Sequence, residues 1–181
     1  MKRNPNPDPL YQLIVTDTPL GNIHYFASSF GLVSLAFYAE LVDLPPMVNL
    51  PEGLTKLKNE IIAYFKGSKQ GFTTEVDLSA LTSFQQDVLE ACIEIPFGAT
   101  RTYGDLAKAV GKPKAAQAVG GVMARNPIPL VIPCHRVIAT SGGMQGYSAA
   151  GGIKTKQFLL AHEGITLFNN PENEENINDR K

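Results

Sequence analysis

Three adjacent residues combine a nucleophile, an acid/base group and a cation: Cys134, His135 and Arg136. A cysteine attacks as the thiolate, and neighbouring cationic or hydrogen-bonding groups lower the pKa of its thiol. Free cysteines are more often small buried hydrophobic residues, but a cysteine kept only for packing does not need His135 and Arg136 after it. The cluster therefore favours nucleophilic chemistry at Cys134.

The segment before this cluster, residues 126–133, is apolar and contains three prolines. Proline restricts its own φ angle and biases the preceding residue toward extended conformations. We therefore expect residues 126–133 to be stiff, mostly extended and largely buried, so that they hold Cys134 in one place. The other cysteine, Cys92, lies on the apolar face of a predicted helix and is expected in the core.

The composition of the chain bounds the class of protein. Its 181 residues are 44% hydrophobic and 18% charged, which allows one domain or two small ones with a buried core. Two cysteines form no disulfide framework, and an unpaired nucleophilic cysteine fits a reducing compartment. The first residues lack the apolar core of a signal peptide, and no apolar run approaches the length that crosses a bilayer. We expect a soluble cytoplasmic protein.

The charge is unevenly distributed along the chain. A net charge of −1 argues against a globally basic nucleic-acid-binding protein. From Arg101 to His162, however, the only acidic residue is Asp105. The same span carries eight basic residues: Arg101, Lys108, Lys112, Lys114, Arg125, Arg136, Lys154 and Lys156. The span could form a local surface for a polyanion, or these residues could be an ordinary solvated face.

The N-terminal half has the pattern of a small antiparallel sheet and a helix. Turn signals separate three β-type segments, predicted at residues 10–16, 23–27 and 32–38. Apolar residues at helical spacing predict an amphipathic helix over residues 54–66. Composition predicts four further features: a loose segment at residues 1–9, a loop at 43–52, a short strand at 74–78 and a domain boundary near 79–83.

The C-terminal half reads as helical. We expect one helix over residues 83–94 with Ser83 as its cap, a second over 103–110 capped by Thr102, and a third over 114–125. The last two, joined by Gly111-Lys112-Pro113, have the form of a helix-turn-helix, although two packed helices are common in any helical domain. Paired glycines cost helix stability, so the thin third helix indicates close approach either to a flat or narrow ligand or to another helix.

A glycine-rich loop and a final helix follow Cys134. Residues 141–152 contain many glycines and one aromatic residue but no phosphate-binding loop pattern, so we expect a pocket wall or lid. A helix is predicted over residues 154–162, ending at Glu163-Gly164, and the polar, acidic residues 169–181 are expected to be disordered.

Several of these segments together resemble the O6-alkylguanine-DNA alkyltransferases, also called methylated-DNA–protein-cysteine methyltransferases. They are IPCHRVI with the preceding Asn126-Pro127, TYGDLA, AVGG, the GYS loop and LLAHEG. The resemblance covers about residues 83–166 and is less specific in the N-terminal segments TPLGNI and GLVSLAF. It implies an α+β fold, with a ribonuclease-H-like antiparallel sheet in a small α/β domain and a helical, winged-helix-like DNA-binding domain. The expected division is residues 1–80 and 81–168 for these domains and 169–181 for the tail.

The resemblance also implies a DNA-repair mechanism. Such proteins flip O6-alkylguanine out of duplex DNA, and a cysteine takes the alkyl group irreversibly, restoring guanine in a single turnover. By resemblance, Cys134 is the acceptor, His135 deprotonates it through a water molecule, and Glu163 orients His135. A thiolate is a soft nucleophile suited to an sp³ carbon, and the departing guanine needs a donor that absorbs negative charge.

Other positions match residues that contact the base or the DNA in this family. Tyr103 matches the tyrosine that donates to the base, and Asn126 the asparagine that ties the recognition helix to the active-site segment. The implied pocket residues are Val137, Tyr147, Ser148 and Met123, and the implied DNA-binding residues are Lys114, Ala116, Gln117, Gly121 and Arg125. The expected partner is double-stranded DNA containing O6-alkylguanine, bound through the minor groove by a monomer, with no membrane involved.

The chain departs from the family pattern in three places. Many members carry an arginine at the position of Gln117, where it inserts into the base stack; glutamine lacks the charge, and Arg125 could substitute for it. We expect weaker DNA binding or slower flipping. Residues 148–152 appear in a loop about two residues longer than usual, which bears on the lid geometry and on the role of Ser148. Some relatives bind zinc through N-terminal cysteines, but none precedes Cys92 here, so we expect no zinc and no other cofactor.

Two other functions compete with the transferase. A turnover thiol hydrolase could use Cys134 and His135, but such enzymes usually bring cysteine and histidine together from distant positions. A non-catalytic lesion-binding protein would resemble this family but lack the acceptor cysteine, which is present here. Repeated turnover on an ester or amide would indicate the first, and binding of alkylated DNA without protein alkylation the second.

Overall fold

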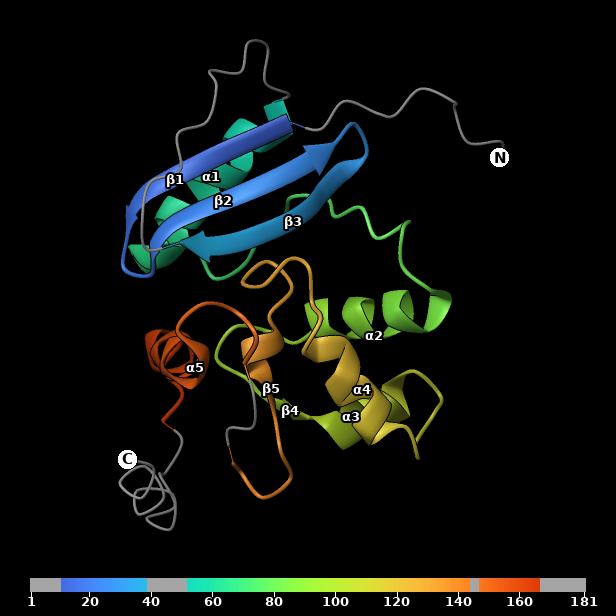
Figure 1. The fold of residues 1–181 in the computed structure, drawn as a ribbon. Coiled ribbons are helices and arrows are strands. Elements are labelled where there is room, and N and C mark those ends of the chain that lie inside the picture. Colours follow the sequence, from blue (N-terminus) through green and yellow to red (C-terminus); the bar gives the residue numbers. More distant parts are fainter. Residues whose placement is uncertain (1–10, 39–51, 144–146, 167–181) are drawn as a thin grey trace, which may run out of the picture.

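The computed structural model describes residues 11–38, 52–143 and 147–166. Figure 1 shows a sheet and one helix from the N-terminal half above a C-terminal half built mainly of helices. This arrangement confirms the predicted α+β fold. Four predicted features lie outside the described residues, wholly or in part: the loose segment 1–9, the loop from residue 43 to 51, positions 144–146 of the glycine-rich loop, and the tail 169–181.

Three strands form the sheet. They are β1 (Tyr11–Thr18), β2 (Gly21–Ser28) and β3 (Gly31–Tyr38), paired antiparallel in that order. Ile23, Tyr25 and Ala27 of β2 share one buried face of the sheet, because successive side chains of a strand point to opposite faces. His24 is buried as well. The strand predictions are confirmed, with ends that differ by one or two residues.

Helix α1 (Glu52–Phe65) packs against the sheet. Its buried residues Leu57, Ile61 and Tyr64 recur at helical spacing, which confirms the predicted amphipathic helix. The short strand predicted at residues 74–78 is not formed. Only Val76 makes a bridge, to Leu32, because two backbone hydrogen bonds hold the segment there: Leu32 N to Glu75 O and Asp77 N to Leu32 O.

The first two helices of the C-terminal half begin at side-chain caps, and the third does not. They are α2 (Ser83–Ile93), α3 (Tyr103–Ala109) after the two-residue strand β4 (Arg101–Thr102), and α4 (Ala116–Met123). Thr102 caps α3 as predicted. The cap of α2 is Thr82 and not Ser83, because Thr82 and Gln85 form a reciprocal capping box. Helix α4 is shorter than predicted at both ends and has no side-chain cap.

Residues 126–133 are buried but not extended, which corrects the sequence-based prediction. Leu130 has a φ angle of 77°, and Ile132 N donates to Ile128 O at 2.9 Å. The Asn126 side chain closes this turn: Ile128 N donates to its Oδ1 at 3.0 Å, and its Nδ2 donates to Ile132 O at 2.9 Å. Proline suits turns as well as extended backbone, so composition alone did not distinguish the two.

The chain then passes through the 3₁₀ helix η1 (Cys134–Arg136), strand β5 (Val137–Ile138) and helix α5 (Gly152–His162). Strand β5 pairs in parallel with β4, with Arg101 opposite Val137. This pairing brings the start of α3 beside the end of η1. No helix among the residues the structure describes is long and apolar enough to cross a membrane.

The two halves of the chain share one buried apolar cluster. Strand β3 also meets the turn before Cys134 directly, because Leu35 N donates to Pro127 O at 2.9 Å. Cys92 lies in the shared cluster and is fully buried, which confirms its assignment to the core. The N-terminal sheet therefore supports the segment that carries Cys134.

We predict that Asn126→Ala lowers the free energy of unfolding by about 2 kcal/mol, because two buried backbone groups lose their partners. Urea denaturation measures the change. Gln157→Ala, an exposed change on α5, serves as a control and should stay within about 0.5 kcal/mol of wild type. A loss for Asn126→Ala no larger than for this control would contradict the role given to Asn126.

Candidate active site

Cys134 is the first residue of η1 and is almost completely buried. Burial raises the pKa of its thiol, while the Asn126 amide, the Lys156 charge and nearby backbone N–H groups oppose that shift. The net direction is upward, so the resting side chain is a thiol. Cys134 therefore becomes a nucleophile when a neighbouring base accepts its proton.

His135 is fully buried and lies next to that thiol in the sequence. Its Nε2 lies 2.9 Å from Glu163 Oε1, and its Nδ1 has no hydrogen-bond partner among the described residues. Burial lowers the pKa of His135, and Glu163 only partly offsets this, so the ring is neutral at pH 7. Because an ionised carboxylate only accepts, Nε2 carries the proton and Nδ1 keeps a lone pair that can accept one.

Glu163 follows α5 and forms the centre of a buried ion cluster. Arg136 donates to it twice, from Nε to Oε2 and from Nη2 to Oε1, each at 2.8 Å. Tyr64 Oη donates to Oε1 at 2.7 Å, and Gly98 N donates to Oε2 at 3.4 Å. Burial opposes ionisation of Glu163, but the hydrogen bonds from His135 and Arg136 outweigh it and lower its pKa to about 2.

The cation near the sulfur is not the one that the sequence suggested. Arg136 faces Glu163 and the carbonyl of Ile95, whereas Lys156 of α5 lowers the pKa of the Cys134 thiol. Lys156 is 1% exposed, and its Nζ donates to Val137 O at 2.6 Å. Arg136 and Lys156 are therefore not part of any basic surface. Helical spacing could have revealed Lys156, since Leu159, Leu160 and Glu163 follow it at i+3, i+4 and i+7.

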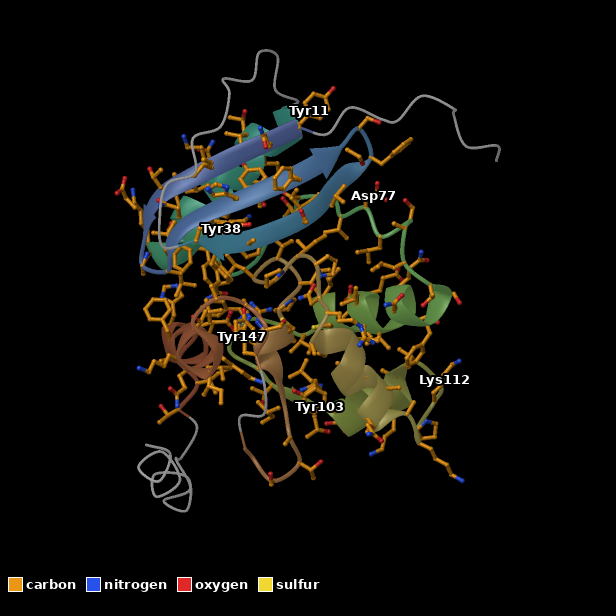
Figure 2. All side chains as sticks on the ribbon, in the orientation of Figure 1. Tyr11, Tyr38, Asp77, Tyr103, Lys112 and Tyr147 are labelled. Carbon is orange, nitrogen blue, oxygen red and sulfur yellow. The ribbon has the colours of Figure 1, made fainter. Side chains whose placement is uncertain are left out.

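The predicted pocket residues have different surroundings. Tyr147 is buried, and burial followed by the charge of Cys134 raises its pKa; the same two causes act more weakly on half-buried Tyr103. Figure 2 labels both tyrosines in the C-terminal half, Tyr147 between α5 and η1. Met123 is buried on α4, and Ser148 is exposed. The carbonyl of Val137 already accepts from Lys156.

The predicted DNA-binding residues lie on and around α4. Val119, Val122 and Met123 bury one face of this helix, whereas Gln117 and Arg125 are exposed and Ala116 and Gly121 are half-buried. Lys114 lines an open pocket with Lys112, Pro113 and Ala115 at the turn between α3 and α4. Figure 2 shows Lys112 at the outer end of this pair of helices. A Cβ atom at Gly120 would meet the Tyr103 ring at 3.9 Å, an ordinary van der Waals contact, so close helix packing does not require a glycine there.

Comparison with known proteins identifies the family. Residues 10–78 match the 6-O-methylguanine DNA methyltransferase ribonuclease-like domain, and residues 83–165 match the DNA binding domain of the same family. A methylated-DNA–protein-cysteine methyltransferase of Methanosarcina acetivorans is 38% identical over 153 residues, which cover 83% of this chain and 96% of that protein. The chain belongs to the methylated-DNA–protein-cysteine methyltransferase family. The resemblance and the predicted transferase class are confirmed.

Solved structures of this family share the fold. The O6-methylguanine methyltransferase of Mycobacterium tuberculosis superposes with a TM-score of 0.73 at 35% identity, over 86% of this chain and 93% of that one. A structure of the same organism's protein in complex with DNA gives a TM-score of 0.72 at 35% identity, over 84% and 92% of the two chains. We therefore interpret the Cys134 site by comparison with these methyltransferases.

We predict that Glu163 makes the stability of the protein sensitive to acid. Its pKa in the folded protein, about 2, lies below the usual 4.5, so its stabilisation is complete above about pH 4.5 and is lost as the pH falls toward 2. Between about pH 5 and pH 2, the free energy of unfolding of wild type should fall about 2 kcal/mol further than that of Glu163→Gln. Urea denaturation at each pH measures both. Glu90→Gln, an exposed change on α2, should show the same pH dependence of unfolding free energy as wild type. The prediction is contradicted if the unfolding free energy of Glu163→Gln falls with pH as steeply as that of wild type.

Proposed function

We propose that this protein repairs duplex DNA by transferring the alkyl group of O6-alkylguanine to Cys134 Sγ. The observation that carries the proposal is the buried His135–Glu163 pair, whose histidine keeps a free Nδ1 and directly follows the buried Cys134 in the chain. Membership of the methyltransferase family supports the same assignment. The related Mycobacterium tuberculosis protein has been solved in complex with DNA, which supports DNA as the partner of this chain.

The transfer is a single displacement at an sp³ carbon. His135 Nδ1 takes the Cys134 proton through a water molecule, and the thiolate attacks the alkyl carbon. The S–C bond forms as the C–O6 bond breaks, and the electron pair stays with guanine. Tyr103 donates a hydrogen bond to the departing base, which takes up one proton from solvent while His135 releases the proton that it took from Cys134. Glu163 holds the ring of His135 and stabilises its protonated form. The thioether product does not hydrolyse, so each molecule acts once.

Base flipping follows from the burial of Cys134. Cys134 is only 5% exposed, so its sulfur cannot reach a base that remains stacked in a duplex. The alkylated guanine must therefore leave the stack. The proposed pocket for this base comprises Tyr103, Met123, Val137, Tyr147 and Ser148. Asn126 links α4 to this pocket because its side chain organises the turn between them.

The DNA surface is the exposed side of α4 with its flanking residues. Its small residues Ala116 and Gly121 let the backbone enter the minor groove closely, with Gln117 placed to hold the gap left by the flipped base. Lys114 and Arg125 are exposed at the two ends of the helix and would pair with phosphates. We propose that one monomer forms this contact.

The central experiment is intact-protein mass spectrometry after mixing the protein with an equal amount of duplex containing O6-methylguanine. We expect the gain of one methyl group, mapped to Cys134 and absent in Cys134→Ser. Repeated release of product would instead indicate a turnover thiol enzyme. Bound DNA with no gain in mass would indicate a lesion-binding protein.

Gln117→Arg tests the proposed DNA surface. Adding a positive charge on the exposed side of α4 should strengthen binding to alkylated duplex by about 3- to 10-fold at low salt, because a cation inserted at this position lies in the negative potential of the minor groove. Fluorescence anisotropy measures the affinity. The control is Gln157→Arg, which adds the same charge on α5, away from α4. Equal affinities for the two variants would contradict insertion of α4 into the groove.

A further inference from the structure

Tyr64 connects the N-terminal half of the protein to the centre of the site. It lies near the end of α1, is fully buried, and donates from Oη to Glu163 Oε1 at 2.7 Å. These residues are 99 positions apart. The rings of Phe72, Phe97 and His162 lie against the Tyr64 ring, and His162 Nε2 lies 2.8 Å from the Tyr64 carbonyl. The hydroxyl is therefore held in a fixed place.

We propose that Tyr64 is a positioning residue for alkyl transfer: its hydroxyl sets the orientation and charge of Glu163, and through Glu163 the proton affinity of His135. This inference rests on the proposed role of His135 as the base. It makes the N-terminal domain a contributor to the chemistry in addition to its support of the fold.

The number of donors on one oxygen carries the argument. Glu163 Oε1 accepts from Tyr64 Oη, Arg136 Nη2 and His135 Nε2 at 2.7, 2.8 and 2.9 Å. Arg136 and His135 are neighbours in η1, so both approach Glu163 from the same short segment. Tyr64 comes from a separate helix and prevents rotation of the carboxylate about that segment. Donors to a carboxylate also draw charge from it, so Tyr64 limits how strongly Glu163 attracts a proton.

Packing alone does not account for the hydroxyl. Four rings, those of Phe65, Phe72, Phe97 and His162, contact the aromatic face or edge of Tyr64, and a phenylalanine would keep these contacts. A buried hydroxyl needs a hydrogen-bond partner, so an apolar side chain of the same shape would be the simpler core residue. The Tyr64 hydroxyl instead donates to the Glu163 carboxylate, which accepts a hydrogen bond from His135.

The expected change in pH dependence follows from the groups around the pair. Among the described residues, Tyr64 from α1, Arg136 from η1 and Lys156 from α5 are the charged and titratable groups that act on His135 and Glu163. Tyr64→Phe removes one donor and leaves the others in place. The Glu163 carboxylate then carries more negative charge on the oxygen that faces His135 Nε2, and this stabilises the protonated form of His135. Since protonated His135 cannot accept the Cys134 proton, the acid limb of the rate profile moves to higher pH.

The test is the single-turnover rate constant of methyl transfer from duplex O6-methylguanine, measured with the full-length protein from about pH 5.5 to about pH 9. We expect Tyr64→Phe to be about 10-fold slower than wild type near neutral pH, a loss typical of a missing outer partner, with its acid limb at higher pH. The matched control is Tyr25→Phe, which removes another buried hydroxyl of the same domain, one that meets the backbone of Lys58. It should keep the wild-type rate and profile, and thermal melts confirm that all variants are folded at the assay temperature.

A double-mutant cycle separates this role from a general effect on packing. In the Glu163→Gln background, Tyr64→Phe should cause no further loss of rate, because the hydroxyl acts through the carboxylate. The proposal is overturned if Tyr64→Phe matches Tyr25→Phe in rate and profile, or if it slows the Glu163→Gln protein by the same factor as wild type. If wild type itself places no methyl group on Cys134, the proposed function fails first and this inference fails with it.

Discussion

The Glu163 carboxylate, at the end of α5, binds donors from three other segments of the chain at one buried point. Tyr64 reaches it from α1, Gly98 from the loop after α2, and His135 and Arg136 from η1. A buried charge is costly unless it is paired and hydrogen-bonded, so these donors must be in place together. The same requirement that stabilises the charge also fixes the orientation of the His135 ring. Through Tyr64, the N-terminal half contributes to the group that orients this ring.

The state of the thiol follows from the same burial. An enzyme that holds a permanent thiolate exposes it to oxidation and to unintended alkylation. Here burial raises the pKa of Cys134, and Lys156 and Asn126 only reduce that shift. The sulfur is kept protonated at rest, and the residue that follows it is a neutral histidine. This arrangement suits the proposed single use of the nucleophile, because reactivity then depends on a substrate that completes the site.

Helix α4 has one face buried in the core and one face exposed to solvent. Its apolar face packs into the core with Val119, Val122 and Met123, and Gly120 faces the Tyr103 ring with room for a Cβ atom. Its other face presents Gln117 and is followed by Arg125. Since packing inside does not require glycine at position 120, the proposed close approach to DNA is the better explanation of the Ala/Gly sequence.

The sequence determined what depends on neighbours along the chain. Turn signals between β-type segments predicted the three strands, the spacing of Leu57 and Ile61 predicted α1, and Thr102 predicted the start of α3, because turns, helical faces and caps are local. The adjacent Cys134 and His135 pointed to the chemistry for the same reason. Only the tertiary structure decided that residues 126–133 turn, that Arg136 and Lys156 are buried, and that Tyr64 meets Glu163. These depend on contacts between distant segments, which no local pattern specifies.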